Sequence, residues 1–315
     1  MRVLFAGTPS LAVPSLRAAA QAHDVVGVLT APDKPSGRGR TSAPPPVALA
    51  ARDLELELLQ PATLGGEVRE RVRQLAPDIL VVVAYGKIFR EAFLSLFPLG
   101  GINLHPSLLP RYRGPTPITA AILNGDAETG VTLQRLALKF DTGDILAQSR
   151  HALAGDETTA SLSEVLAVEG AELLGGVLAS LAQGRPPAAR AQDEASATYC
   201  GLLSKDNGII SWGAPAAVIE RQVRAFDPWP RASTSLHGET LLVLKTHVGP
   251  GTLSPDEARG VPGDVLTADR DHGLLIRTGD GILAVERLQP QFKKPQDWKS
   301  FLNGHPDVVG SRLGT

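Results

Sequence analysis

Short, continuously apolar runs, separated by segments with helical spacing, dominate the first third of the chain. The runs cover Val3–Ala6, Val25–Leu29, Ile79–Ala84 and Ile102–Leu104. A strand that is apolar on both faces is typical of a parallel sheet covered on both sides. After the first run, Thr8 is placed to cap a helix that starts at Pro9. The pattern predicts a doubly wound, Rossmann-like α/β fold with a mostly parallel sheet, whose ligands bind beyond the carboxyl ends of the strands.

The second half of the chain changes character after one long helical segment. Thr159–Gln183 is rich in Ala and Leu at helical spacing, and Gly184 with the prolines that follow it ends the segment. Another helix is predicted over Pro215–Phe226. Short alternating runs then follow at Thr240–Thr246, Val261–Thr267, Gly273–Thr278 and Gly281–Leu288. Evenly spaced strands with Gly and Pro turns predict a small, OB-like β-barrel. We therefore predict an N-terminal domain over 1–187, a linker over 188–204 and a C-terminal β-barrel domain over 205–315.

Composition is that of an ordinary globular protein, with 43% hydrophobic and 20% charged residues. A formal net charge of -2 gives no global attraction to phosphate, so any nucleic-acid contact has to come from local basic patches. The turn Gly7-Thr8-Pro9 lacks the further glycines of a dinucleotide-binding loop, so a bound dinucleotide is not expected. The seven histidines are scattered without metal-ligand spacing, and we expect no metal.

One cysteine, Cys200, rules out an internal disulfide and fits a reducing compartment. The apolar start is broken at Gly7, too early for a signal-peptide core, and no apolar run is expected to approach a membrane-spanning length. We expect a cytoplasmic monomer with no membrane contact.

Polar groups gather at the end of the last predicted strand, in the stretch from Gly101 to Gly114. Asn103 and His105 are two residues apart, so they point to the same side if the strand extends that far. An amide donor and an imidazole that titrates near neutral pH suit acyl transfer to an amine. The alternative interpretation is a strand end whose polar groups are simply satisfied.

A second polar cluster, Asp141-Thr142-Gly143-Asp144, follows the β-like run Val131–Leu136. A loop at this position can return to the same cleft, where Asp141 would orient or charge His105. The alternative interpretation is a turn built from residues that turns favour.

Several motifs together resemble one family. Phe5–Pro9, Asn103–Pro110, Gly130–Thr132 and Asp141–Asp144 match, in order and spacing, the formyltransferases that use 10-formyltetrahydrofolate. Two further stretches resemble the members of that family that act on methionyl-tRNA. They are Ala31–Arg40 and the downstream pair Leu203–Lys205 and Arg224–Pro230. The resemblance runs from about Arg2 to near the C-terminus.

The resemblance implies that Asn103, His105 and Asp141 act as one catalytic unit. The α-amino group of the methionyl ester of initiator tRNA would attack the formyl carbon, and Asn103 with protonated His105 would stabilise the oxyanion. His105, held by Asp141, would carry the proton from the amine to N10 of the folate. The neighbouring carboxylate favours the charged imidazolium. The product would be N-formylmethionyl-tRNA for translation initiation.

The resemblance also assigns the co-substrate segment. Ser107, Leu108, Leu109 and Pro110 match the family's folate-binding signature. This segment would offer an apolar wall and backbone groups to the pterin ring. The alternative is a plain buried loop.

Contacts to tRNA are expected from a loop and from the C-terminal domain. The loop 32–46 is too polar for a strand and carries Lys34, Arg38 and Arg40, of which Arg38 is the strongest candidate. In the C-terminal domain, residues 205–315 contain as many acidic as basic side chains, so only charge gathered on one face would bind tRNA. The candidates there are Lys205, Arg221, Arg224, Arg231, Lys245, Lys293, Lys294 and Lys299. Before Asp141, Ala137 and Lys139 stand where the family is expected to have Asp and Gly.

Two other functions remain open from the sequence. One is a folate-dependent formyltransferase acting on an amino sugar or a purine precursor, or a hydrolase that releases formate from the same folate. The other is a non-catalytic RNA-binding protein built on a nucleotide-binding domain and a barrel.

Overall fold

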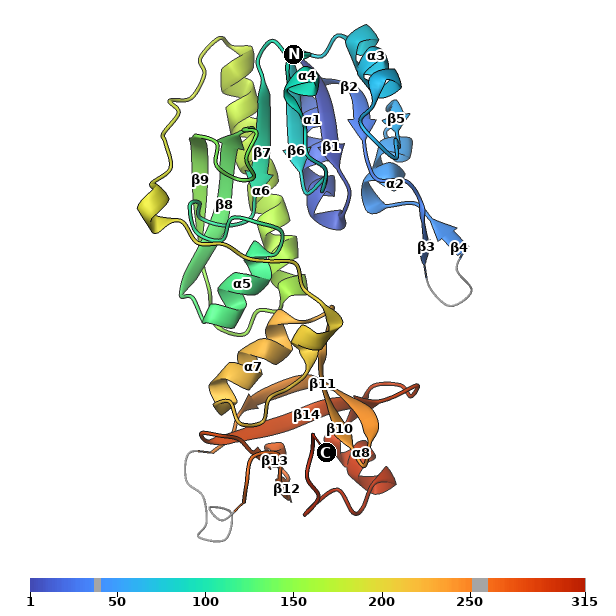
Figure 1. The fold of residues 1–315 in the computed structure, drawn as a ribbon, viewed down its shortest axis with the longest axis vertical. Coiled ribbons are helices and arrows are strands. Elements are labelled where there is room, and N and C mark those ends of the chain that lie inside the picture. Colours follow the sequence, from blue (N-terminus) through green and yellow to red (C-terminus); the bar gives the residue numbers. More distant parts are fainter. Residues whose placement is uncertain (37–40, 251–259, 315) are drawn as a thin grey trace. The chain divides into compact units, whose positions relative to one another are not determined.

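The computed structural model describes residues 1–36, 41–250 and 260–314, and the chain divides into two compact units (Figure 1). The first unit contains Met1–Pro117, Glu128–Ala152 and Leu162–Gly201. The second contains Ile118–Ala127, Leu153–Ser161 and Leu202–Thr315. The segment after the long helix, up to Gly201, thus belongs to the first unit.

A seven-stranded sheet forms the centre of the first unit, with strand order β5-β2-β1-β6-β7-β8-β9. The strands are β1 Arg2–Gly7, β2 Asp24–Leu29, β5 Leu58–Leu59, β6 Ile79–Val83, β7 Gly101–His105, β8 Glu128–Arg135 and β9 Ile145–Ala152. The first five in chain order are parallel to one another, whereas β8 runs antiparallel to both β7 and β9. The predicted Rossmann-like, mostly parallel sheet is confirmed.

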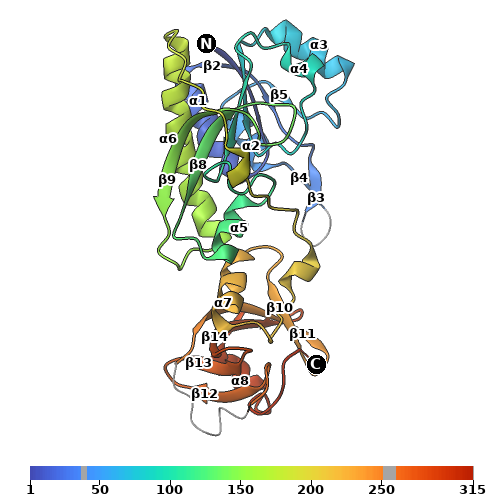
Figure 2. The same cartoon turned by 60° about the vertical axis from the view of Figure 1, so that its left-hand side comes forward.

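Helices cover both faces of this sheet, as the uniformly apolar strands require. They are α1 Val13–Ala22, α2 Pro46–Asp53, α3 Gly66–Leu75, α4 Glu91–Leu94 and α6 Thr159–Ala182. Another helix, α5 Pro117–Asn124, belongs to the second unit from Ile118 onward. Figure 2 shows α1 and α6 on one side of the sheet and α3 and α4 on the other. On the α3 and α4 side, Val72 and Phe93 pack with Leu4 and Leu80 in one buried cluster. On the α6 side, Gly170 lies directly against Leu104 of β7.

The helix after β1 begins later than the sequence predicted. Thr8 does not cap it, because the hydroxyl of Thr8 is buried without a hydrogen-bond partner and Pro9 is still extended. A short 3-10 turn over Ser10–Ala12 comes first, and α1 then starts at Val13 with a proline in its first turn. A proline at the helix start was expected, but the proline that serves is Pro14.

By length and composition alone, α6 could cross a membrane, so the statement that no apolar run approaches that length was wrong. A helix in the core of a water-soluble protein can be equally long and equally apolar. Here a third of the helix residues are buried, Leu166, Gly170 and Leu174 among them. These positions are spaced by four residues and lie on one face, so α6 packs as a covering helix of the sheet.

The loop predicted to be too polar for a strand forms a two-stranded ribbon, β3 Lys34–Ser36 and β4 Thr41–Ala43. The ribbon is a separate antiparallel pair and does not extend the central sheet. Polar residues are compatible with such a ribbon because neither of its faces has to enter a core.

The second unit is built on an antiparallel sheet, which confirms the predicted C-terminal β domain. Its strands follow the order β10-β11-β14-β13-β12, with β15 paired to β14. They are β10 Ala232–Leu236, β11 Glu239–Val248, β12 Val265–Asp269, β13 Gly273–Arg277, β14 Ile282–Pro290 and β15 Gln296–Asp297. The helices α7 Ala216–Ala225 and α8 Trp298–Gly304 close its core, where Ile219 and Phe301 are buried.

Candidate active site

Strand β7 carries Asn103 and His105 to its carboxyl end on one side of the sheet. The strand extends to His105, so the two side chains do share a direction. On the antiparallel neighbour, Asn103 lies opposite Gln134 and His105 lies opposite Thr132. His105 is only 4% exposed, whereas Asn103 is half-buried. The predicted pair therefore exists, with the imidazole deeper than the amide.

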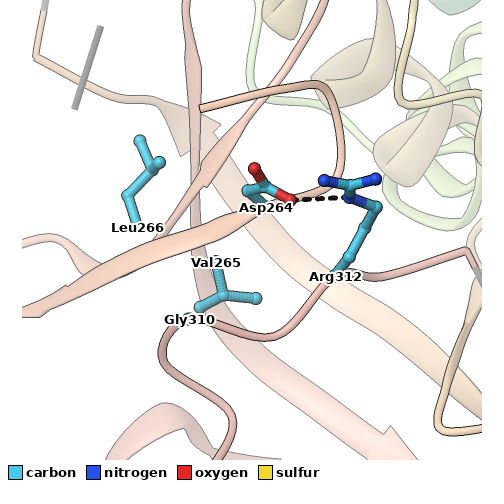
Figure 3. A pocket seen from close by; sticks show the side chains of 5 residues that line it. All are labelled: Asp264, Val265, Leu266, Gly310 and Arg312. Atoms are coloured by element: carbon cyan, nitrogen blue, oxygen red, sulfur yellow. Dashed lines mark hydrogen bonds and ion pairs between the residues drawn. The ribbon is translucent and has the colours of Figure 1, made fainter. Parts of the chain in front are cut away.

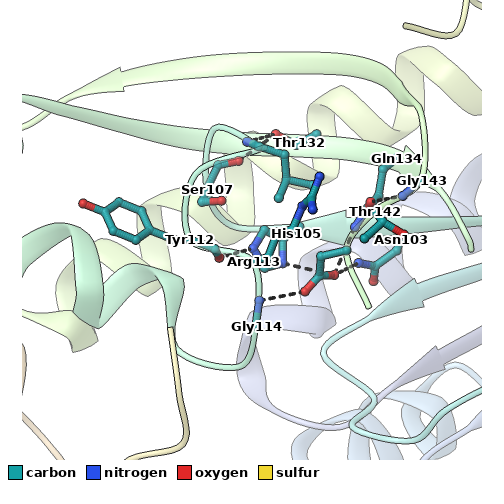
Figure 4. Close-up of polar contacts among 12 residues, drawn as sticks. Asn103, His105, Ser107, Tyr112, Arg113, Gly114, Thr132, Gln134, Thr142 and Gly143 are labelled. Carbon is teal, nitrogen blue, oxygen red and sulfur yellow. Dashed lines mark hydrogen bonds and ion pairs between the residues drawn. The ribbon is translucent and has the colours of Figure 1, made fainter. Parts of the chain in front are cut away.

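Asp141 comes from the loop between β8 and β9 and contacts Asn103 and His105. Figure 4 shows these two side chains close together, with Gln134 and Gly114 nearby. The Oδ1 atom of Asp141 lies 3.6 Å from Nδ1 of His105 and accepts a hydrogen bond of 3.3 Å from the amide of Asn103. Asp141 adopts a positive φ of 53°, a left-handed conformation uncommon for a residue other than glycine. The loop geometry therefore aims the carboxylate back at the strand end.

Two hydrogen-bond donors that were not predicted from the sequence also contact the Asp141 carboxylate. The side-chain amide of Gln134 donates to Oδ1 at 3.0 Å, and the backbone amide of Gly114 donates to Oδ2 at 2.9 Å. The signal for Gln134 was present in the sequence, because it lies on the predicted strand that precedes Asp141. Gly114 has φ 116°, and a Cβ there would sit 2.2 Å from the carbonyl oxygen of Cys200. Glycine is therefore required where the chain turns toward the carboxylate.

The imidazole of His105 is held between two oxygen acceptors. Its Nε2 atom lies 2.8 Å from the carbonyl oxygen of Tyr112, and its Nδ1 atom faces Asp141. A neutral ring has one N–H, so one of its nitrogens then faces an oxygen without a proton between them. Nevertheless burial lowers the pKa of His105 below its ordinary value of 6.5, against the opposing attraction of Asp141 and the Tyr112 carbonyl.

This direction corrects the expected protonation state of His105. From the sequence, the neighbouring carboxylate was expected to favour a protonated His105. In the structure, removal of the ring from water outweighs that attraction, so the neutral ring is favoured at neutral pH. A neutral imidazole is a base rather than a donor of positive charge.

Two family models match the chain, one for each unit. Residues 1–178 match the model described as "Formyl transferase", and residues 202–306 match the one described as "Formyl transferase, C-terminal domain". The chain belongs to the formyl transferase family. The family resemblance drawn from the motifs is confirmed.

Relatives of similar length support the same assignment. A methionyl-tRNA formyltransferase of Treponema denticola is 45% identical over 317 residues, covering 98% of this chain and 98% of the relative. Its counterpart in Treponema pallidum is 46% identical over 324 residues, covering 100% and 99%. One from Borrelia hermsii is 39% identical over 310 residues, covering 98% and 99%.

Solved structures share the fold at much lower identity. HypX from Aquifex aeolicus, in complex with tetrahydrofolic acid, is 19% identical with a TM-score of 0.61, covering 98% of this chain and 48% of HypX. An N-formyltransferase from Helicobacter canadensis, in complex with folinic acid and dTDP-3-aminofucose, is 20% identical with a TM-score of 0.65, covering 90% and 98%. At this identity the likeness concerns the fold alone.

The segment assigned to folate, Ser107–Pro110, is held tightly by neighbouring strands. The hydroxyl of Thr132 donates to the carbonyl of Ser107 at 2.7 Å and accepts from the amide of Leu109 at 3.1 Å. Gln148 donates to the carbonyl of Leu109 at 2.9 Å. Those backbone groups are thus bonded within the chain, and the binding of folate by this segment stays a prediction. The groups left at its surface are the half-buried side chains of Leu108 and Pro110.

The residues predicted to contact tRNA lie partly within the described structure. Lys34 is exposed on β3, and Lys205 is exposed at the start of a 3-10 turn over Lys205–Gly208. Arg38 and Arg40 lie outside the described residues. In the second unit, Arg224 and Lys245 are already paired with Glu220 and Glu286. These two basic side chains therefore carry a carboxylate partner of their own.

A hollow of about 400 Å³ belongs to the second unit and has no part in the geometry around Asp141. Asp264 and Arg312 line it and form an ion pair of 2.7 Å across it (Figure 3). The other lining residues are Val265, Leu266 and Gly310. Throughout residues 1–36, 41–250 and 260–314, no three His, Cys, Asp or Glu side chains are arranged to hold a metal ion.

Proposed function

We propose that this chain transfers the formyl group of 10-formyltetrahydrofolate to the α-amino group of methionyl initiator tRNA. The observation that carries the chemistry is the convergence of Asn103 and His105 on one oxygen of Asp141, at 3.3 Å and 3.6 Å. The observation that supports the substrate is the 45% identity to a methionyl-tRNA formyltransferase over nearly the whole chain. The product, N-formylmethionyl-tRNA, would serve translation initiation, and the enzyme would work in the cytoplasm.

Asn103 is suited to stabilise the charge that develops on the formyl oxygen. Attack by the α-amino group turns the formyl carbonyl into an oxyanion, which requires hydrogen-bond donors already in place. A carboxamide nitrogen has two N–H groups, and Asn103 uses one of them on Asp141. The second N–H is therefore available to the oxyanion while the first fixes its direction.

His105 is suited to take the proton that the attacking amine loses. Its pKa lies below the ordinary value, so the free enzyme presents a neutral ring. In the neutral ring, one nitrogen presents a lone pair to a protein oxygen. When this nitrogen gains a proton, the repulsive contact becomes a hydrogen bond, and the Asp141 carboxylate then faces a positively charged imidazolium. The same proton can pass to N10 of the departing folate as the formyl carbon collapses to the amide. In this scheme His105 acts first as base and then as acid.

An amino-sugar substrate is the main alternative within the family. Solved sugar formyltransferases share the fold, with a TM-score of 0.65 for the one from Helicobacter canadensis at 20% identity. Fold likeness does not select a substrate. Identity of 39–46% to methionyl-tRNA formyltransferases favours the tRNA substrate. A non-catalytic role is disfavoured because the three polar side chains converge as a catalytic site requires.

The direct test mixes purified protein with 10-formyltetrahydrofolate and charged initiator tRNA and measures N-formylmethionyl-tRNA. Parallel reactions replace the tRNA with free methionine, with a nucleotide-linked amino sugar or with a purine precursor amine. We expect formylation of methionyl-tRNA alone. Formylation of the sugar or of the purine precursor without the tRNA product would overturn the proposed substrate, and free formate in every reaction would indicate a hydrolase.

A further inference from the structure

The segment that follows α6 forms part of the first unit and runs along the candidate site. We call residues 190–201 the strap. Arg190 exchanges backbone hydrogen bonds of 2.8 Å and 2.9 Å with Ile145 at the start of β9. Further on, the backbone of Arg113 donates to Thr198 and accepts from Cys200, each at 2.8 Å. The strap is therefore fastened at both ends to elements that flank Asp141.

Between these two attachments, the side chain of Gln192 reaches the loop that carries Asp141. Its amide nitrogen lies 2.9 Å from the carbonyl oxygen of Asp141 and 2.7 Å from that of Gly143. The same nitrogen lies 3.3 Å from the side-chain oxygen of Gln134. Gln134 in turn donates to Oδ1 of Asp141, the oxygen that faces His105. The Gln192 carboxamide thus contacts the backbone of the loop that carries Asp141. It also contacts Gln134, the residue that orients the Asp141 carboxylate.

The other end of the Gln192 carboxamide is fixed by a buried arginine. Arg113 is 1% exposed, and two of its nitrogens donate to the oxygen of Gln192 at 3.1 Å and 2.9 Å. Glu194 of the strap neutralises the guanidinium through two contacts of 2.7 Å and 2.9 Å. Because a buried charge without partners is costly, Arg113 holds this part of the strap in place. The direction of the Gln192 amide is set by these contacts, since its oxygen has to face the donors.

We propose that Gln192 is a positioning residue, which holds Asp141 toward His105 through the loop carbonyls and Gln134. The left-handed φ of Asp141 is a conformation that persists only when its surroundings hold it. Gln192 supplies two hydrogen bonds to that loop from outside it. Its role in turnover rests on the proposed function, whereas its effect on the Asp141–His105 contact does not.

The test measures the pKa of His105 in the free protein by NMR titration of the histidine ring protons. A His105→Gln variant assigns the resonance among the seven histidines. The group that raises the pKa of His105 electrostatically is Asp141, and the Tyr112 carbonyl raises it by hydrogen bonding. Release of the Asp141 loop therefore lowers the pKa of His105 further. Gln192→Met keeps the side-chain length and removes both the donor and the acceptor.

We expect Gln192→Met and Asp141→Asn each to lower the pKa of His105, and the double variant to match Asp141→Asn alone. Such non-additivity identifies two residues that act through one contact. Gln192→Asn, which keeps an amide but is one methylene shorter, should shift the pKa in the same direction. It decides the question if Gln192→Met does not fold. An unchanged or raised pKa in the folded variant would overturn the proposal.

A matched control is available in the second unit. Gln222 also donates to two backbone carbonyls, those of Asn207 at 3.0 Å and Ile209 at 3.2 Å, but has no connection to Asp141. Gln222→Met should leave the pKa of His105 unchanged, and a shift equal to that of Gln192→Met would mean that the effect is nonspecific and the proposal is wrong.

In formyl transfer, Gln192→Met should lower kcat about tenfold or more while KM for the folate changes about twofold or less, because misplaced groups lower turnover more than binding. A KM effect alone would overturn the positioning role. If the wild-type protein forms no formylmethionine but the pKa shift occurs, the proposed function fails and the positioning of Asp141 stands.

Discussion

The protonation of His105 depends on two opposing effects, and both arise only in the folded chain. Both of its ring nitrogens face oxygens, at 2.8 Å and 3.6 Å, and these contacts favour the charged ring. Burial at 4% exposure favours the neutral ring and is the larger effect. A neutral base next to a carboxylate that stabilises its protonated form is suited to transient proton storage.

Truncation of Asn103 or of His105 tests the catalytic roles at this scale. Asn103→Ala should lower kcat by about 10² or more, the loss that follows removal of one oxyanion donor. His105→Ala should lower it by about 10²–10⁴, the usual contribution of a positioned acid–base group. Steady-state formyl transfer to methionyl-tRNA measures the effect. Asn303→Ala serves as the control, because Asn303 is an exposed residue of α8 in the second unit. Near-normal turnover in both site variants would contradict the mechanism.

The protonation of His105 should also appear in the pH dependence of stability. Its pKa is lower in the folded protein than the ordinary 6.5, so the unfolded chain binds more protons as the pH falls. The contribution of His105 to stability is therefore complete above pH 6.5 and is lost as the pH falls through that value toward the folded pKa.

Urea unfolding between pH 7.5 and 5.5 measures this contribution when the wild type is compared with His105→Gln. The wild type should lose stability more steeply over this interval, because glutamine does not titrate. Carboxylates contribute equally to both proteins and cancel in the comparison. Parallel slopes would show that His105 has an ordinary pKa in the folded chain.

At the residue scale, the sequence predicted which side chains meet but not their protonation. Asn103 and His105 were predictable because residues two apart on a strand share a face. Asp141 was a candidate because its loop can return to the strand end, and the family resemblance favoured it over the alternative of a plain turn. Gln192 was not predictable, because a glutamine in a small-residue segment carries no signal of what its amide contacts across the fold.

At the scale of elements, one helix and one strand illustrate close packing. A Cβ on Gly170 of α6 would lie 2.7 Å from a methyl group of Leu104 on β7, whereas one on Gly175 would meet nothing within 4 Å. Gly170→Ala should therefore destabilise the protein by about 1 kcal/mol, because overpacking outweighs the better helix propensity. Gly175→Ala should stabilise it by about 0.5–1 kcal/mol through propensity alone.

The two alanine variants differ only in what surrounds the added methyl group, so chemical denaturation of both provides the measurement and its control. Opposite signs are expected. Stabilisation by both substitutions would mean that α6 does not lie close to Leu104 on β7.

Elements were predictable where the local pattern alone determined them. The apolar strands β1, β2, β6 and β7 and the long helix α6 were found because their periodicity is strong. Strand β9 was missed, since its residues after Ile145 are mostly half-buried and the apolar signal is weak. The ribbon of β3 and β4 was missed because a strand outside any core needs no apolar face. Thr8 failed as a cap because the chain makes a 3-10 turn before α1 starts.

At the scale of the whole molecule, charge alone does not attract the proposed tRNA. The chain has 31 basic and 33 acidic residues, so binding has to rely on local basic groups. In the second unit, Arg224 and Lys245 already have carboxylate partners. Lys205, Lys293, Lys294 and Lys299 are exposed in the same unit. In the first unit, the loop residues Lys34, Arg38 and Arg40 stay the predicted phosphate contacts.

Salt dependence separates such phosphate contacts from all other contributions to binding. Each phosphate contact that a basic side chain makes releases counterions, so its loss reduces the slope of log affinity against log salt concentration by about one.

Arg38→Ala should therefore weaken methionyl-tRNA binding, with the largest effect at low salt, and reduce the slope by about one. Folate binding should stay unchanged, because Arg38 is not among the residues assigned to the pterin. Titrations of tRNA at several salt concentrations, with Arg17→Ala as control, give both quantities, because Arg17 lies on α1 beside Asp53. Equal weakening of tRNA and folate binding, or an unchanged slope, would exclude Arg38 as a phosphate ligand and leave the exposed lysines of the second unit as the candidates.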